Sequence, residues 1–341
     1  MLKLRQASVV SVDPLMVELA GERRKAWADE AMVGPCEIGD EVIVNVEALD
    51  LGLGSGGFDI VHVNLTRGLG ASGSAEDHVM KLNYSSLQHP VGSIERSVNE
   101  ELAVAPAVPV MAIGLHGHLA PAVWAASETA RSKGAVAPKV GYIQTGGGAL
   151  PGSFSRDVAR LLEMNLLSGH VTSGAAYGGD DEAITLVGAI DAARLLGWDA
   201  LVAGPGPGIL GSATHFGHGG MMALDVAHAG LSLGAPVVLC PRLSRGDPRP
   251  RHRGLSHHSR AVLELLLGGV DVPLPKGMDG IATIVDSIGE GRHKVVFEEI
   301  DIQGYADSGL PRRTMGRDID DDPEFFSGPL AAGARLASLA V

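Results

Sequence analysis

The feature that most constrains the fold is an alternation, between residues 108 and 300, of short apolar runs with longer amphipathic segments. The apolar runs are Val108–Leu115, Lys139–Gln144, His170–Ala176, Asp199–Ala203, Pro236–Cys240 and Lys294–Ile300. The segments with helical patterning are Pro121–Lys133, Phe154–Leu167, Glu182–Leu196, Met221–Leu233 and Ser259–Leu267. Strands that alternate with such helices form βαβ units and a parallel sheet. We therefore predict a mostly parallel, doubly wound α/β sheet, because a closed eightfold barrel would need more repeats.

The first hundred residues have a different pattern, in which short runs alternate apolar and polar residues without helical segments between them. These runs are Leu4–Val12, Leu15–Leu19, Glu41–Val46 and Phe58–Leu65. Short strands at this spacing predict a small barrel-like β domain. We assign residues 1–105 to this β-rich domain, 106–302 to an α/β ligand-binding domain, and 303–341 to an acidic C-terminal tail.

Composition excludes several classes of protein. The formal charge is 27 − 40 = −13, and an acidic chain is a poor partner for nucleic acid because phosphate contacts dominate that affinity. Two distant cysteines make no disulfide framework, which indicates a reducing compartment. The N-terminus lacks a signal-peptide core, and no apolar run reaches the roughly 18 residues of a membrane span. We expect a cytoplasmic protein with neither nucleic-acid nor membrane partners.

In a doubly wound sheet, ligands bind outside the carboxyl ends of the strands. In this chain the loops that follow the predicted strands are long and rich in glycine and histidine, whereas the loops at the opposite edge are short. Nine of the 13 histidines lie in or beside these loops: His116, His118, His170, His215, His218, His228, His252, His257 and His258. We therefore predict one ligand cleft at this edge of the sheet.

The loop after the fifth predicted strand is strongly basic. Six of the 27 cationic residues lie between residues 242 and 260, against one acid, Asp247. Because guanidinium groups fit carboxylate and phosphate, we expect Arg249, Arg251 and Arg253 to bind an anion, with Ser256 capping the next helix. The alternative is that these arginines neutralise the protein's own acids.

Glycines in two other loops are further candidates for substrate binding. Gly147 and Gly148 lie between a strand and a helix, where backbone N–H groups can bind an anion, and Gly206 follows the fourth strand. Ser153 stands where a phosphate-binding P-loop has its lysine, so the loop is not a true P-loop. An ordinary tight turn is the alternative.

Titratable side chains in the same loops are candidates for catalysis. His257, His258, His116 and Asp180 are the residue types that serve as general acids and bases. A divalent metal, if one is bound, would be held by His116, His118 and Asp180, because imidazole and carboxylate are common ligands. Asp180 at a helix start would also stabilise the helix dipole without a metal.

Several motifs together resemble a known family. They are Arg249-x-Arg251-His-Arg-Gly-Leu-Ser-His257-His258, Asp50-Leu-Gly-Leu-Gly-Ser-Gly-Gly57, His78-Val-Met-Lys-Leu, Gly147-Gly-Ala-Leu-Pro151 and Gly204-Pro-Gly. With these the chain resembles, nearly end to end, an uncharacterised bacterial family known as domain of unknown function 3866. The resemblance implies no established activity.

The leading hypothesis is a small-molecule enzyme, a hydrolase or transferase, acting on a substrate that bears a phosphate or carboxylate. The basic loop would bind the anion, a histidine would move the proton, and a metal could assist. Two alternatives stay open: a non-catalytic ligand-binding or regulatory protein, and an assembly protein whose glycine-rich surfaces form a homo-oligomer.

Overall fold

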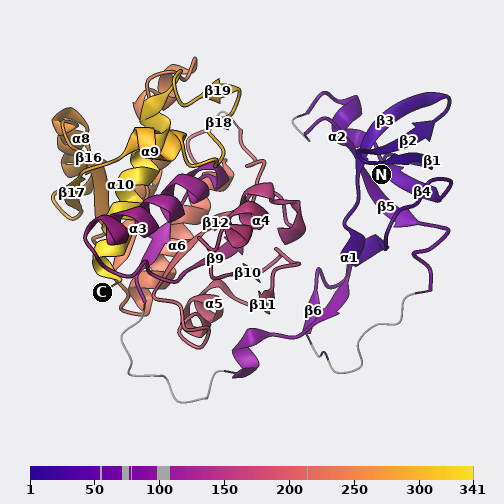
Figure 1. Ribbon diagram of the computed structural model, residues 1–341, viewed down its shortest axis with the longest axis horizontal. Helices are drawn as coiled ribbons and strands as arrows, with labels where there is room; N and C mark the ends of the chain where they lie inside the picture. The colour runs from indigo at the N-terminus through magenta and orange to yellow at the C-terminus, as the bar shows by residue number, and fades with distance from the viewer. Residues whose placement is uncertain (54–55, 71–76, 78, 98–107, 213, 341) are drawn as a thin grey trace. The chain divides into compact units, whose positions relative to one another are not determined.

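The computed structural model describes residues 1–53, 56–70, 77, 79–97, 108–212 and 214–340, and the chain divides into two compact units (Figure 1). Unit 1 is Met1–Val91 and unit 2 is Gly92–Val341. Among the described residues, none of the helices combines the length and apolar character that crossing a membrane requires.

Unit 1 is built around a closed five-stranded barrel, which confirms the predicted small β domain. Its strands are β1 (Leu4–Val12), β2 (Leu15–Leu19), β3 (Glu22–Trp27), β4 (Glu41–Asn45) and β5 (Asp59–Asn64), in the order β1-β2-β3-β5-β4. Alternate residues such as Val42 and Val44 point inward and form the core. Outside the barrel lie α1 (Glu30–Val33), α2 (Glu47–Asp50) and the pair β6 (Val79–Lys81) and β7 (His89–Val91).

Unit 2 contains an eight-stranded sheet in which all strands are parallel, so the predicted doubly wound α/β fold is confirmed. The strand order is β11-β10-β9-β12-β8-β13-β16-β17. The bounds are β8 (Val110–Ala112), β9 (Val140–Thr145), β10 (Gly169–Ser173), β11 (Asp181–Ala183), β12 (Ala200–Pro205), β13 (Val237–Leu239), β16 (Asp271–Pro275) and β17 (Lys294–Glu298). The central strands are buried on both faces, as their continuous apolar runs predicted.

Helices cover both faces of this sheet. One face carries α3 (Leu119–Ser132), α4 (Arg156–Glu163), α9 (Ile302–Ala306) and α10 (Pro323–Leu339). The other carries α5 (Leu186–Ala192), α6 (Met222–Ser232), α7 (His257–Leu265) and α8 (Asp279–Gly289). Residues 303–341, which we had set apart as a tail, belong to unit 2, and Phe325 and Leu330 of α10 are part of its core.

Two strands of the sheet were not predicted. Residues 181–183 form the edge strand β11, whereas we had predicted a helix from Glu182, because a three-residue strand of this composition has no apolar run to reveal it. β16 contains Pro273 and Pro275, which argue against an internal strand, yet it lies between β13 and β17.

The connections open a crevice at the carboxyl edge of the sheet. The chain leaves β8 for α3 on one face, whereas it leaves the neighbouring strands β12 and β13 for α6 and α7 on the other. Loops that diverge in this way leave space between them, the usual ligand position in open α/β sheets. The loops after β8, β12 and β13 therefore flank the candidate site.

Candidate functional site

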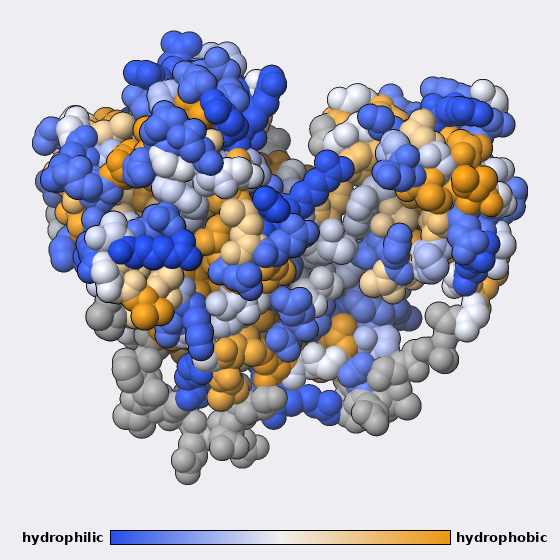
Figure 2. Space-filling model, in the orientation of Figure 1, coloured by the Kyte–Doolittle hydropathy of each residue, from blue (hydrophilic) through white to orange (hydrophobic). Residues whose placement is uncertain are grey.

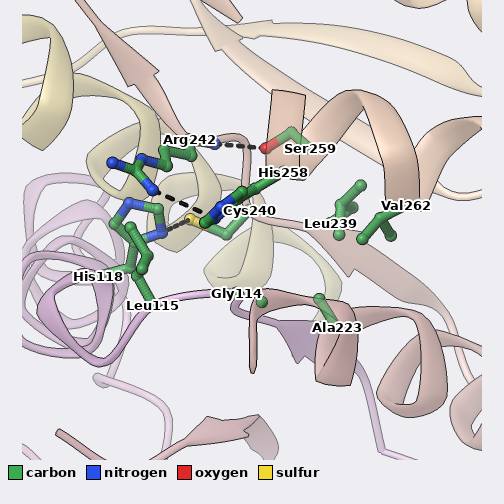
Figure 3. Close-up of a pocket in the computed structure, with 11 residues that line it drawn as sticks. Gly114, Leu115, His118, Ala223, Leu239, Cys240, Arg242, His258, Ser259 and Val262 are labelled. Carbon is green, nitrogen blue, oxygen red and sulfur yellow. Dashed lines mark hydrogen bonds between the residues drawn. The ribbon is translucent and has the colours of Figure 1, made fainter. Parts of the chain in front are cut away.

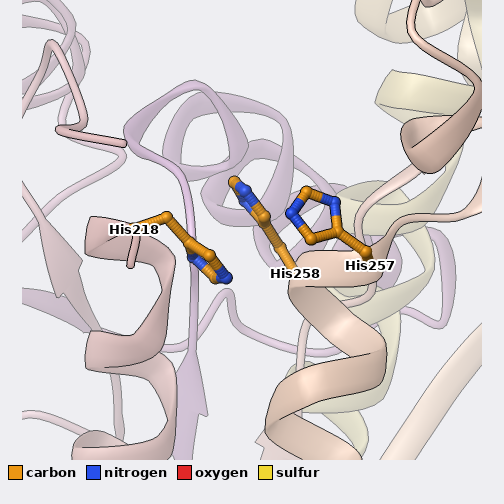
Figure 4. A group of neighbouring side chains, drawn as sticks. All are labelled: His218, His257 and His258. Atoms are coloured by element: carbon orange, nitrogen blue, oxygen red, sulfur yellow. The ribbon is translucent and has the colours of Figure 1, made fainter. Parts of the chain in front are cut away.

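Four histidines from the loops after β12 and β13 form one group, which we call the histidine cluster: His218, His252, His257 and His258. His218 precedes the short helix η4 (Gly219–Met221), His252 ends η5 (Pro250–His252), and the other two begin α7. The rings of His218 and His258 are stacked 3.6 Å apart, and those of His257 and His258 are 4.4 Å apart (Figure 4). Candidate ligand atoms of His218, His257 and His258 all lie within 4.8 Å of one another.

The hydrogen bonds of the cluster leave several ring nitrogens without partners. His218 Nε2 donates to the carbonyl oxygen of His215 at 3.1 Å, so Nδ1 carries the lone pair, and this buried atom has no described partner. Neither ring nitrogen of His257 makes a hydrogen bond of good geometry to the described atoms, although the backbone carbonyl of Arg251 is near enough to the ring to raise its pKa. His258 Nδ1 accepts from Arg242 Nη1 at 3.1 Å. Unpaired imidazole nitrogens of this kind are costly to bury unless a ligand uses them.

All the imidazoles of the cluster are neutral near pH 7. Burial and then the charge of Arg242 lower the pKa of His252 to about 3 and that of His258 to about 2. Burial, with the charges of His218 and Arg251, lowers the pKa of His257 to about 4, although the Arg251 carbonyl opposes the shift. These side chains can therefore offer lone pairs or N–H groups rather than positive charge.

A buried carboxylate gathers the nearby arginines. Asp247 is fully buried and accepts two hydrogen bonds of 2.9 Å from the guanidinium of Arg249, with Arg242 Nη2 at 3.3 Å and Arg317 Nη2 at 3.4 Å. Burial alone would raise the pKa of Asp247, but the hydrogen bonds and charge of Arg249 hold it well below its usual range. Asp247 is thus an ionised anchor for the basic loop.

The predicted anion clamp of Arg249, Arg251, Arg253, His257 and His258 is only partly assembled in this structure. Arg253 Nε donates to the carbonyl of Asp247 at 3.0 Å, and Arg249 pairs with its carboxylate. Arg251 is exposed and, in the part of the chain that the structure describes, makes no ion pair. Ser256 caps α7 as predicted, accepting from the N–H of His258 at 3.3 Å. The clamp itself stays a prediction.

A small cavity lies between the histidine cluster and β8. It measures about 10 Å³, the size of one water site, and its lining includes His118, Cys240, Arg242 and His258 (Figure 3). The Cys240 thiol and His118 Nδ1 are 3.4 Å apart. Burial raises the pKa of Cys240 well above its usual range and lowers that of His118 to about 3. This cysteine is therefore a neutral thiol and not a ready nucleophile.

His116 belongs to a separate hydrogen-bonded chain. The Ser155 hydroxyl, which accepts from Val158 N and caps α4, donates to His116 Nε2 at 2.7 Å. His116 Nδ1 lies 3.3 Å from the hydroxyl of Tyr142, whose own proton points to the carbonyls of Gly204 and Pro205. The Nδ1–H tautomer satisfies every member, and it gives a serine–histidine pair with the base oriented by a third group.

Next to these hydrogen bonds, at the carboxyl edge of the sheet, is a cleft of about 550 Å³. It is lined by Leu115, His116, Gly117, Gly208, Ile209, Pro248, Arg249, Thr314, Met315, Arg317 and Phe325. The cleft therefore brings together one predicted catalytic residue, His116, and one predicted anion-binding residue, Arg249. Arg317 and Thr314 come from residues 303–341, which were predicted to form a tail.

The remaining candidates lie in other surroundings. A Cβ on Gly148 would come within 2.2 Å of the carbonyl oxygen of Gly206, so these glycines let two loops touch, as in the tight-turn alternative. Asp180 accepts from the N–H of His170 on β10, three strands away from β8. His116, His118 and Asp180 are not among the groups of described residues that could share a metal.

Fold and site together define an α/β protein whose imidazole and guanidinium groups gather at the switch point of a parallel sheet. The chain belongs to the family described as protein of unknown function (DUF3866), whose model matches residues 25–333 of 341. The family resemblance predicted from the arginine–histidine stretch is thereby confirmed. No curated protein and no solved structure matches the chain significantly.

Proposed function

We propose that unit 2 is an enzyme acting on a small molecule that bears a phosphate or carboxylate, and that this substrate binds in the 550 Å³ cleft. The observation that carries the proposal is the convergence of His116, Arg249 and Arg317 on one concave site at the switch point of the sheet. A pocket with a few converging polar groups and perturbed titratable side chains is the usual form of a small-molecule site.

The charge around the cleft favours an anion. Arg242, Arg249 and Arg317 share the carboxylates of Asp247 and Asp322, so three guanidinium groups face two acids. This local excess of positive charge lies in a chain whose formal charge is −13. A cleft of opposite sign to the rest of the protein concentrates anionic ligands.

The hydrogen-bonded pair of His116 and Ser155 supports the hydrolase or transferase class. Burial lowers the pKa of His116 to about 4, which keeps the imidazole in its basic form at neutral pH. Its Nε2 already accepts the Ser155 proton at 2.7 Å, as an activating base would. In the alternative, a ligand-binding protein, the same pair would only hold η2 (His116–His118) against α4.

The test is the melting temperature of the chelator-treated protein in phosphate and in citrate. At tenfold the Kd, we expect a rise of roughly 3–5 °C. Arg249→Gln, which keeps a hydrogen-bond donor for Asp247 but removes the charge, should lose most of the rise. Arg251→Ala separates the cleft from the clamp predicted from the sequence: Arg251 is exposed and does not line the cleft, so under the present proposal this variant keeps the rise.

The opposite pattern, in which Arg251→Ala abolishes the rise and Arg249→Gln retains it, would move the anion out of the cleft and contradict the proposal. Turnover of simple phosphate and carboxylate esters, lost in Ser155→Ala, would distinguish the enzyme from the ligand-binding alternative. For the assembly alternative, Figure 2 offers no support on the face that it displays, since hydrophobic residues of unit 2 lie there in small groups among polar ones.

A further inference from the structure

We propose that His218, His257 and His258 bind a divalent transition-metal ion, with Zn²⁺ as the reference case. The site is distinct from the predicted His116, His118 and Asp180 set. It does not depend on the proposed function, because its residues belong to the histidine cluster and not to the lining of the 550 Å³ cleft. Three imidazoles are the ligands that zinc, copper, nickel and cobalt prefer, whereas magnesium and calcium prefer oxygen.

His218 already has the hydrogen bonding of a metal ligand. Its Nε2–H donates to the backbone carbonyl of His215, which leaves the lone pair on Nδ1. That nitrogen is buried without a described partner, and the ring that carries it lies beside those of His258 and His257 (Figure 4). Metal-bound histidines usually donate their other N–H to a carbonyl or carboxylate, because this fixes the tautomer and the ring orientation.

Neither ring nitrogen of His257 makes a hydrogen bond of good geometry to the described residues, and its ring centroid is 5.4 Å from that of His218. A partly buried imidazole without hydrogen bonds gains nothing from its polarity within the protein alone. A bound cation would use one of its nitrogens and leave the other free to donate.

His258 must give up its hydrogen bond with Arg242 before its Nδ1 can bind a metal ion. Its Nδ1 lone pair accepts from Arg242, which can only donate. Metal binding therefore replaces this hydrogen bond, and Arg242 keeps its ion pair with the buried Asp247. Asp247, which Arg249 and Arg317 also contact, offsets part of the charge of Arg242 and so weakens its repulsion of a cation.

Gly220 leaves room where two of the ligand atoms converge. A Cβ at this position would lie 3.0 Å from His218 Nδ1 and 3.2 Å from His258 Nδ1. The Nδ1 atoms of His218 and His258 thus border the same small space, which is open because residue 220 is a glycine. Since tetrahedral zinc sets its nitrogens roughly 3.4 Å apart, small rotations from the present separation of up to 4.8 Å complete the site.

The experiment uses the full chain, stripped with a chelator and dialysed, then titrated with Zn²⁺ by calorimetry and with Co²⁺ by visible absorption. We expect one saturable equivalent of Zn²⁺ and the d–d bands of nitrogen-ligated cobalt. His218→Ala should weaken Zn²⁺ binding at least about 100-fold, since removing a ligand costs more than removing an outer-sphere partner. His215→Ala is the matched control, with a change below about threefold, because that exposed ring lies three residues away and outside the triad.

A second variant keeps all three ligands. Gly220→Ala should weaken binding about tenfold by filling the space between the nitrogens, whereas Gly280→Ala, in open space on α8, should leave the affinity unchanged. If His218→Ala does not fold, as judged by its circular dichroism without metal, His257→Ala replaces it. Absence of saturable binding, or equal affinity in the parent and the ligand variants, overturns the proposal. The phosphate and citrate measurements are made in chelator, so the two proposals can fail separately.

Discussion

In unit 2, His116 and the histidine cluster are alike in that burial lowers the pKa values of their imidazoles, but they differ in their hydrogen bonding. His116 has a partner on each ring nitrogen, Ser155 on one side and Tyr142 on the other. In the histidine cluster, His218 Nδ1 and both nitrogens of His257 have no described partner. The comparison separates two kinds of desolvated imidazole: one whose ring nitrogens are both occupied by side chains of the protein, and one with ring nitrogens available to an external ligand.

The two groups also differ in how the chain assembles them. His116 lies directly after β8 and joins the neighbouring segments β9 and α4 through single hydrogen bonds. The cluster joins the loops after β12 and β13 mainly by ring stacking, such as that of His218 on His258. Stacked neutral rings can slide past one another at little cost in free energy. Side chains whose donors and acceptors are all paired cannot move without breaking hydrogen bonds.

The largest effect is expected for the substitution His116→Ala, on the free energy of unfolding. His116→Ala leaves the buried hydroxyls of Ser155 and Tyr142 without their imidazole partner, and it leaves a cavity beside β9. We expect a loss of about 3 kcal/mol in the free energy of unfolding. Urea unfolding followed by tryptophan fluorescence measures it, in a Trp27→Phe background, so that only Trp124 and Trp198 of unit 2 report. A loss below about 1 kcal/mol would show that the hydrogen bonds joining Ser155, His116 and Tyr142 do not reinforce one another.

A smaller effect is expected in the pH dependence of the free energy of unfolding. The pKa of His116 is about 4 in the folded protein because of burial, and about 6.5 when unfolded. Below pH 6.5 the unfolded chain therefore binds more protons, so the contribution is complete above pH 6.5 and is lost as the pH falls toward 4. Relative to pH 8, the free energy of unfolding at pH 5 should fall by roughly 2 kcal/mol through this residue. The difference in the free energy of unfolding between the parent and His116→Gln, measured at both pH values, isolates the contribution of His116. If the free energies of the two proteins change in parallel with pH, the low pKa of His116 in the folded protein is contradicted.

The smallest effect is expected in the cluster. His257→Ala removes an imidazole that makes no hydrogen bond to the described residues, so the free energy of unfolding without metal should stay within about 1 kcal/mol of the parent. The same urea titration measures it. A loss as large as that of His116→Ala would mean that the cluster, too, serves the fold, and the contrast between the two groups would disappear.

Periodicity was enough to predict the architecture. The apolar runs found β8, β9, β10, β12, β13 and β17, and the site rule for open sheets placed the histidine-rich loops at one edge. Family membership followed from the arginine–histidine stretch. The cytoplasmic location, the small anionic partner, the homo-oligomer and the absence of a nucleic-acid partner remain predictions.

Pairing within the site could not be predicted, because it depends on contacts across the fold. Arg317 was left out because nothing in its local sequence shows that it would reach Asp247, 70 residues earlier. Ser155 falls inside the predicted helical segment Phe154–Leu167, and only the fold brings it to His116. His218 is one of several loop histidines in the sequence, and Gly219-Gly220 beside it is a local signal of the close approach to α7 that the structure shows.

The position of α10 has a consequence for how the protein is made. This helix packs on α3 (Figure 1) so closely that a Cβ on Gly333 would lie 2.1 Å from the carbonyl oxygen of Ala122, and it also packs against β13 and β16. On a ribosome, unit 1 emerges first and can close its barrel. At 5–20 residues per second, α10 follows roughly 10–50 s later. During that interval the apolar surfaces of α3 and the central strands are uncovered, so nascent unit 2 is expected to need chaperones until its final helix arrives.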